Sequence, residues 1–232
     1  MERQAPARSH LIACEVFRDE FEALAPPDLP RTYVAQGLHR TPAKMPEKIQ
    51  EAMDGIPGEP EAVLLGYGLC SMGIVGVVSR KAPLVLPRVH DCIALLLGSR
   101  ERYAAEVVAC AGTYYITPGW VKYGETVLSA LKADYMKKYS EEDALYIARE
   151  MLKSYSRVAL VDHGLGDMAL ARDHAREMAR LFDLRYEEIP GSLDYLRRLV
   201  QGPWDEADFL RIEPGEPIAS APFLGMPAIP LQ

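Results

Sequence analysis

Short apolar runs alternate with amphipathic segments along most of the chain. Runs rich in β-branched and aromatic residues predict strands, and apolar residues at helical spacing predict helices. We expect helices at residues 17–25, 45–53, 93–110, 169–181 and 193–200, and two more within 123–155, where Ser140 can cap the second. We expect strands at residues 9–16, 31–38, 61–69, 83–89, 113–117, 157–162, 185–189 and 208–212.

Strands that alternate with helices favour βαβ units, and therefore an α/β fold with a helix-flanked, mostly parallel sheet. Residues 1–212 are predicted to form a single α/β domain. Because eight strands exceed one minimal sheet, two Rossmann-like lobes at 9–111 and 112–212 are the alternative. Residues 213–232 are rich in proline and glycine, and we expect them to form a tail over the surface.

Composition excludes several classes of function. The net charge is −7, and no Lys/Arg-rich block is present, so a nucleic-acid surface is not expected. No apolar run reaches the roughly 20 residues that span a bilayer, and residues 1–9 lack the apolar centre of a signal peptide. We therefore expect a cytoplasmic protein, in which cysteines are thiols or metal ligands rather than disulfides.

Three of the four cysteines follow predicted strands. Cys14 lies near the end of the first strand, Cys70 follows the run 61–69, and His90 and Cys92 follow the run 83–89. The carboxyl ends of parallel strands meet at one edge of a sheet, where open α/β sheets place their ligands. Thiolate and imidazole are ligands that favour zinc in tetrahedral geometry. The pattern thus predicts one metal ion on these four residues.

Two alternatives stay open for these cysteines. An iron–sulfur cluster can use three cysteines with a histidine as the fourth ligand. Buried cysteine also packs as a small hydrophobic residue, which requires no metal at all. Cys110, beside Gly112, lacks such a placement and is not expected to be a ligand.

Two residues are candidate proton carriers. Glu15, directly after Cys14, could move a proton or accept a hydrogen bond from His90. His163 ends the predicted strand 157–162 and could do acid–base work with Asp162 or Asp167. A glycine-eased turn in which Asp167 only caps the next helix is the alternative.

Three further residues are candidates for ligand contacts, and with Asp162 and Asp167 they complete the predicted cofactor-binding set. Arg88 and Arg100 are candidates to bind an anion. Trp120, placed on a turn after Pro118, is expected to line a pocket. No complete phosphate-binding glycine motif and no serine nucleophile elbow is present.

Four segments resemble a known family. IACEVFRDE (12–20), GYGLC (66–70), LPRVHDCIALLLGSRERY (86–103) and GTYYITPGW (112–120) resemble the uncharacterised family called domain of unknown function 1638, over about residues 9–212. The resemblance implies a role near cobalamin methyl transfer, because members are often encoded beside corrinoid-dependent methyltransferase systems. It also implies that Cys14, Cys70, His90 and Cys92 match positions of the family pattern, whereas Cys110 does not.

The leading hypothesis is a zinc-binding accessory protein or enzyme of one-carbon or corrinoid metabolism. If it is an enzyme, the metal would activate a thiol or a water molecule. A non-catalytic module that binds a corrinoid or a corrinoid protein is the alternative, as is an iron–sulfur redox protein. The DxHxxG spacing typical of corrinoid binding is absent around Asp162 and His163. A small molecule or a corrinoid protein is the expected partner.

Overall fold

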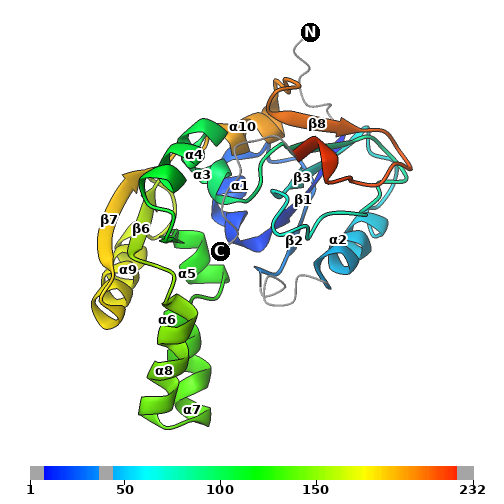
Figure 1. Ribbon diagram of the computed structural model, residues 1–232. Coiled ribbons are helices and arrows are strands. Elements are labelled where there is room, and N and C mark those ends of the chain that lie inside the picture. Colours follow the sequence, from blue (N-terminus) through cyan, green and yellow to red (C-terminus); the bar gives the residue numbers. More distant parts are fainter. Residues whose placement is uncertain (1–7, 37–43, 224–232) are drawn as a thin grey trace.

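The computed structural model describes residues 8–36 and 44–223 and contains two sheets (Figure 1). The larger has the order β2-β1-β3-β4-β8, in which the first four strands are parallel and β8 is antiparallel to β4. The smaller is parallel, in the order β5-β6-β7. The predicted α/β class with helix-flanked, mostly parallel sheets is confirmed. The strands are β1 (Ser9–Cys14), β2 (Arg31–Val34), β3 (Ala62–Gly66), β4 (Leu84–Pro87), β5 (Thr113–Ile116), β6 (Arg157–Asp162), β7 (Arg185–Pro190) and β8 (Phe209–Ile212).

The central strands are those with the longest apolar runs. Every residue of β1, β3 and β4 is buried, because these strands have neighbours on both sides and helices on both faces of the sheet. In contrast, β7 is the edge of the small sheet and has exposed charged positions such as Arg185.

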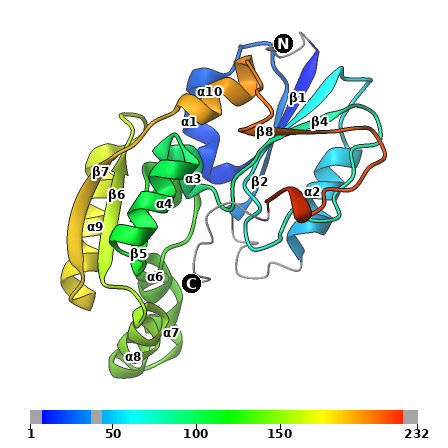
Figure 2. The same ribbon diagram turned by 45° about the horizontal axis from the view of Figure 1, so that its top comes forward.

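Helices cover both faces of the large sheet. Helix α2 (Met45–Asp54) lies on one face, and α1 (Arg18–Leu24) and α10 (Asp194–Gln201) lie on the other. Helices α3 (Ile93–Leu97), α4 (Arg100–Ala109) and α10 separate the two sheets in both views (Figures 1 and 2). The amphipathic helix α9 (Met168–Phe182) packs on β6 and β7 of the small sheet.

Two local expectations are wrong. The helix expected over 93–110 is split, because Gly98 takes a left-handed conformation (φ 82°) and Ser99 then caps α4 by accepting the N–H of Arg102. Trp120 does not lie on a turn but in helix α5 (Pro118–Tyr123). Thr117 caps that helix, and Pro118 suits its first position.

A helical projection extends from the small sheet (Figure 1). It comprises α6 (Val127–Ala130), a π-helical turn η4 (Leu131–Tyr135), α7 (Met136–Lys138) and α8 (Glu141–Leu152). The side chain of Ser140 accepts the N–H of Asp143 at the start of α8, so the predicted cap is confirmed.

The last described segment returns to the large sheet. Pro217 forms a bridge with Val78, and Ile218 and Phe223 are buried in the same core, Phe223 within the short helix η5 (Ala221–Phe223). The rest of the predicted tail, residues 224–232, lies outside the described residues. Within residues 8–36 and 44–223, none of the helices has the length and apolar character that a bilayer crossing requires.

Candidate functional site

Three cysteines meet at the carboxyl edge of the large sheet. Cys14 is the last residue of β1, Cys70 lies four residues beyond the end of β3, and Cys92 lies five residues beyond the end of β4. Their residues are only 2%, 4% and 6% exposed, respectively. Parallel pairing of β1 with β3, and of β3 with β4, is the reason that residues so far apart in the chain lie together.

The three thiols interact with one another. Cys92 is hydrogen-bonded to Cys70, and this bond together with burial raises the pKa of the Cys92 thiol well above its usual value. Burial raises the pKa of Cys14 to about 12, and the charge of Cys70 adds to the rise. Burial, and then the same three cysteines, raise the pKa of the Tyr67 hydroxyl, which is hydrogen-bonded to Cys14. The thiols of Cys14 and Cys92 are therefore protonated at neutral pH when no metal compensates their charge.

Backbone contacts hold the loop after β3 against the loop after β4. The N–H of Leu69 donates to the Val89 carbonyl at 2.9 Å, and the N–H of Cys70 donates to the His90 carbonyl at 2.9 Å. The backbone of His90, the fourth predicted ligand, thus lies beside Cys70. His90 itself is half-buried.

The chain at Cys70 is strained. Cys70, Ser71 and Met72 have φ values of 47°, 55° and 67°, which is the left-handed region for three consecutive residues with side chains. Such a conformation costs about 1–2 kcal/mol for each residue. Strain of this kind gathers at functional sites, where the surrounding structure imposes it.

Asp91 lies between the two predicted ligands of the HDC triplet. Its Oδ1 accepts the N–H of Ile93, the first residue of α3, at 2.8 Å, and its Oδ2 accepts the hydroxyl hydrogen of Tyr103. Burial raises the pKa of Asp91 to about 6, although the hydrogen bond from Tyr103 opposes the rise. Tyr103 was not among the predicted site residues. The only sequence signal was its place in the segment 86–103.

The four cysteines all fall in the described part of the chain, and no disulfide joins any of them. Cys110 lies apart from the other three and contacts Ser156 at 3.4 Å, as expected for a residue outside the metal set. In residues 8–36 and 44–223, the present side-chain positions form no group of three or more His, Cys, Asp or Glu residues that could hold a metal ion. Metal binding at the three thiols therefore requires their side chains to turn toward the ion.

The predicted proton carrier His163 has an unexpected partner. Its Nε2 lies 3.1 Å from Oε1 of Glu20, and the two side chains are 0% and 1% exposed, respectively. Its Nδ1 accepts the N–H of Leu165 at 3.3 Å. This pair joins α1 to the loop after β6. Because the His163 side chain is fully buried, neither ring nitrogen is accessible to a substrate in this conformation.

Glu15 and the two arginines of the predicted set also have protein partners. Glu15 accepts a hydrogen bond from Arg18 at 2.8 Å. Arg88 Nε donates to the Pro222 carbonyl at 2.7 Å, and Arg100 lies 3.6 Å from Oδ1 of Asp208. An anion at either arginine would have to replace these contacts.

The remaining candidates lie at the carboxyl edge of the small sheet. Asp162 Oδ1 accepts the N–H of Gly164 at 3.1 Å, and Asp167 caps α9 by accepting the N–H of Leu170 at 2.9 Å. Trp120 is half-buried against the core of the large sheet. The carboxylates thus stabilise the turn, which is the alternative that the sequence left open.

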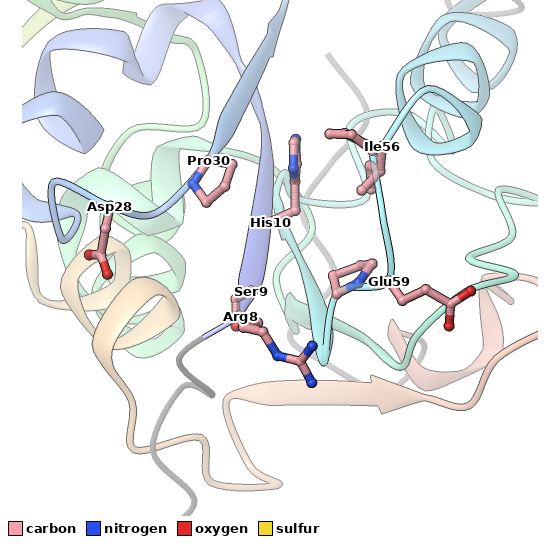
Figure 3. Close-up of a pocket in the computed structure, with 9 residues that line it drawn as sticks. Arg8, Ser9, His10, Asp28, Pro30, Ile56 and Glu59 are labelled. Carbon is pink, nitrogen blue, oxygen red and sulfur yellow. The ribbon is translucent and has the colours of Figure 1, made fainter.

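A cavity of about 340 Å³ lies at the opposite edge of the large sheet, where the strands begin (Figure 3). Arg8, His10, Asp28 and Glu59 are among its lining residues, and none of the predicted site residues is. His10 contacts Thr32 at 2.9 Å, and burial lowers the pKa of its imidazole. Its amino-end position separates this cavity from the thiol site.

A comparison with family models matches residues 33–200 to a family described as a protein of unknown function, DUF1638. No curated protein matches the chain. No solved structure matches it either.

Proposed function

Because the chain belongs to the DUF1638 family, whose description assigns no activity, we propose from the site itself that the protein binds one transition-metal ion, preferably zinc. Cys14, Cys70 and Cys92 would supply three thiolates, and His90 would complete a tetrahedral set. The observation that supports this proposal most is the meeting of three buried, interacting thiols at one sheet edge.

The placement of the thiols favours metal binding over simple packing. Packing of a hydrophobic core does not require cysteines to gather at one place. Here each of the three cysteines lies at or just beyond the end of a different strand of the same sheet, and backbone hydrogen bonds join the loop after β3 to the loop after β4. The strained turn at Cys70 is a further sign, since ordinary packing does not require three left-handed residues. Thiolate donors select zinc, copper(I) or iron–sulfur centres rather than magnesium or calcium.

The chemistry that we propose for the bound ion is activation of a thiol or a water molecule in one-carbon or corrinoid metabolism. The link to methyl transfer rests on the family resemblance. The residues themselves support the metal preference. The near-complete burial of the three thiols means that a substrate reaches the ion only if the covering loops move.

Elemental analysis tests the proposal. The wild-type chain, purified anaerobically without chelators, is expected to retain about one zinc ion per chain. The Cys92→Ser variant is expected to lose it. Cys110→Ser is the matched control, because it removes a thiol outside the cluster, and it should retain the metal at the wild-type level.

The possible results separate the hypotheses. Several irons per chain with equal sulfide would move the protein to the iron–sulfur class. Unchanged metal content in Cys92→Ser would overturn the ligand assignment. No metal in any sample, even after incubation with zinc, would leave the cysteines as packing residues and end the proposal.

A further inference from the structure

Helix α4 contacts the turn before Cys92 through the side chain of Tyr103. Tyr103 donates its hydroxyl hydrogen to Oδ2 of Asp91, while Oδ1 of the same carboxyl group accepts the N–H of Ile93. Asp91 is the residue before Cys92, and Ile93 is the residue after it. The two hydrogen bonds of the Asp91 carboxyl group therefore fix the turn that bears the Cys92 thiol. The ring of Tyr103 is buried, only 5% exposed, and packs edge-on against Tyr115 with centroids 6.1 Å apart.

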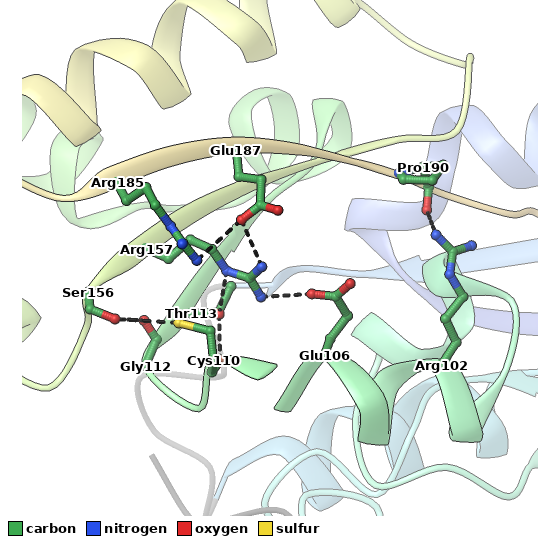
Figure 4. Close-up of polar contacts among 10 residues, drawn as sticks. All are labelled: Arg102, Glu106, Cys110, Gly112, Thr113, Ser156, Arg157, Arg185, Glu187 and Pro190. Atoms are coloured by element: carbon green, nitrogen blue, oxygen red, sulfur yellow. Dashed lines mark hydrogen bonds and ion pairs between the residues drawn. The ribbon is translucent and has the colours of Figure 1, made fainter. Parts of the chain in front are cut away.

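The same helix is anchored to the small sheet. Glu106, one turn after Tyr103, accepts a hydrogen bond from Arg157 at 2.7 Å (Figure 4). The Arg157 side chain is 3% exposed and also contacts Glu187 at 2.9 Å. Helix α4 thus has a fixed position, from which Tyr103 reaches the turn at Asp91.

We propose that Tyr103 is a positioning residue of the thiol site, which acts through Asp91 to hold the backbone turn that carries Cys92 in the place from which its thiol can reach a metal ion. This inference rests on the proposed metal binding. Groups that hydrogen-bond the surroundings of a metal ligand fix the position of the chain that carries it, and their loss typically lowers metal affinity by about 10–100-fold. A hydroxyl held by both α4 and a carboxyl group is suited to this role.

The experiment compares Tyr103→Phe with Glu106→Gln. The first removes only the hydroxyl that binds Asp91, and the second weakens the attachment of the same helix to Arg157 without touching the turn. Zinc affinity is measured by competition with a chelator at fixed pH, well below the melting temperature of each apo variant. The cobalt(II) form reports on the thiolate-to-metal charge-transfer band.

Tyr103→Phe is expected to lower zinc affinity by about tenfold and to alter the cobalt band. Glu106→Gln should lower the melting temperature but leave both readouts at wild-type values. Asp91→Asn retains an oxygen for Ile93 and a polar group for Tyr103, so it should bind zinc more tightly than Asp91→Ala does.

Equal losses of affinity in Tyr103→Phe and Glu106→Gln would show only a loosened helix and overturn the inference. Wild-type affinity in Tyr103→Phe would overturn it as well. Failure of the wild-type chain to bind zinc or cobalt is a different result, because it refutes the proposed function itself.

Discussion

The contact between α5 and the turn after β1 leaves no room for a side chain at Gly119. A Cβ atom added there would lie 1.8 Å from the carbonyl oxygen of Val16 and 2.9 Å from its carbonyl carbon. Both are backbone atoms, so no flexible side chain can move aside. Val16 belongs to the helical turn η1 (Glu15–Phe17), which directly follows Cys14. Gly119→Ala therefore forces α5 away from the turn beside the thiol site.

Gly119→Ala should change stability in the direction opposite to the one that helix propensity predicts. In a helix, replacement of glycine by alanine normally stabilises by up to about 1 kcal/mol. Overpacking of a tight contact costs about 1–3 kcal/mol, and a backbone-to-backbone contact belongs at the upper end. We expect Gly119→Ala to lower the free energy of unfolding by about 3 kcal/mol, or the melting temperature by about 6–12 °C for a chain of this size.

Urea denaturation followed by circular dichroism measures this difference. Lys122→Ala on the same helix is the matched control, since it removes the half-exposed ion pair with Asp19, at 2.9 Å, and an exposed contact with the Tyr123 ring, and should cost no more than about 1 kcal/mol. A Gly119→Ala variant as stable as the wild type, or more stable, would refute the close contact between α5 and η1.

Three more outcomes follow from the buried polar groups. Iodoacetamide should label Cys110 well before the three buried thiols, because the hydrogen bond with Ser156 lowers the pKa of Cys110, while burial raises the pKa of Cys14 and the hydrogen bond with Cys70, together with burial, raises the pKa of Cys92. Peptide mass spectrometry after partial labelling checks this, and comparable labelling of a buried thiol would contradict it. Arg157→Ala should lower the free energy of unfolding by about 3 kcal/mol in urea denaturation, because it leaves Glu106 without its buried partner. A decrease below about 1 kcal/mol would mean that the pair contributes little to stability. Burial raises the pKa of Asp91 from 3.8 to about 6 in the folded protein, so the folded state binds the proton more tightly than the unfolded state. The free energy of unfolding should therefore fall as the pH rises from about 4 to about 6. If Asp91→Asn shows the same dependence of unfolding free energy on pH as the wild type, other groups cause it.

The sequence alone predicted every strand of the two sheets, because most are short runs of apolar, β-branched or aromatic residues between turn residues. It could not show that β8 pairs antiparallel with β4, since pairing between residues so distant in the chain leaves no local pattern. The split at Gly98 was hidden for another reason. A glycine within a helical pattern is often tolerated, and only its left-handed φ in the structure ends the helix there.

The candidate site could be predicted from the sequence only as far as the ends of the strands could be predicted. Cys14, Cys70 and Cys92 were expected to meet because parallel strands share a carboxyl edge, and the structure brings them together. The pairing of His163 with Glu20 was not predictable, because it joins a helix of one sheet to a loop of the other. Glu20, near the start of α1, is only 1% exposed, and no local sequence pattern indicates that burial.

X-ray absorption at the zinc edge tests the central claim most directly, with the wild-type chain loaded anaerobically with one equivalent of zinc. The account predicts three sulfur neighbours at about 2.3 Å and one nitrogen at about 2.0–2.1 Å. A spectrum with only oxygen and nitrogen neighbours, or zinc that washes away from the wild-type chain, would contradict it.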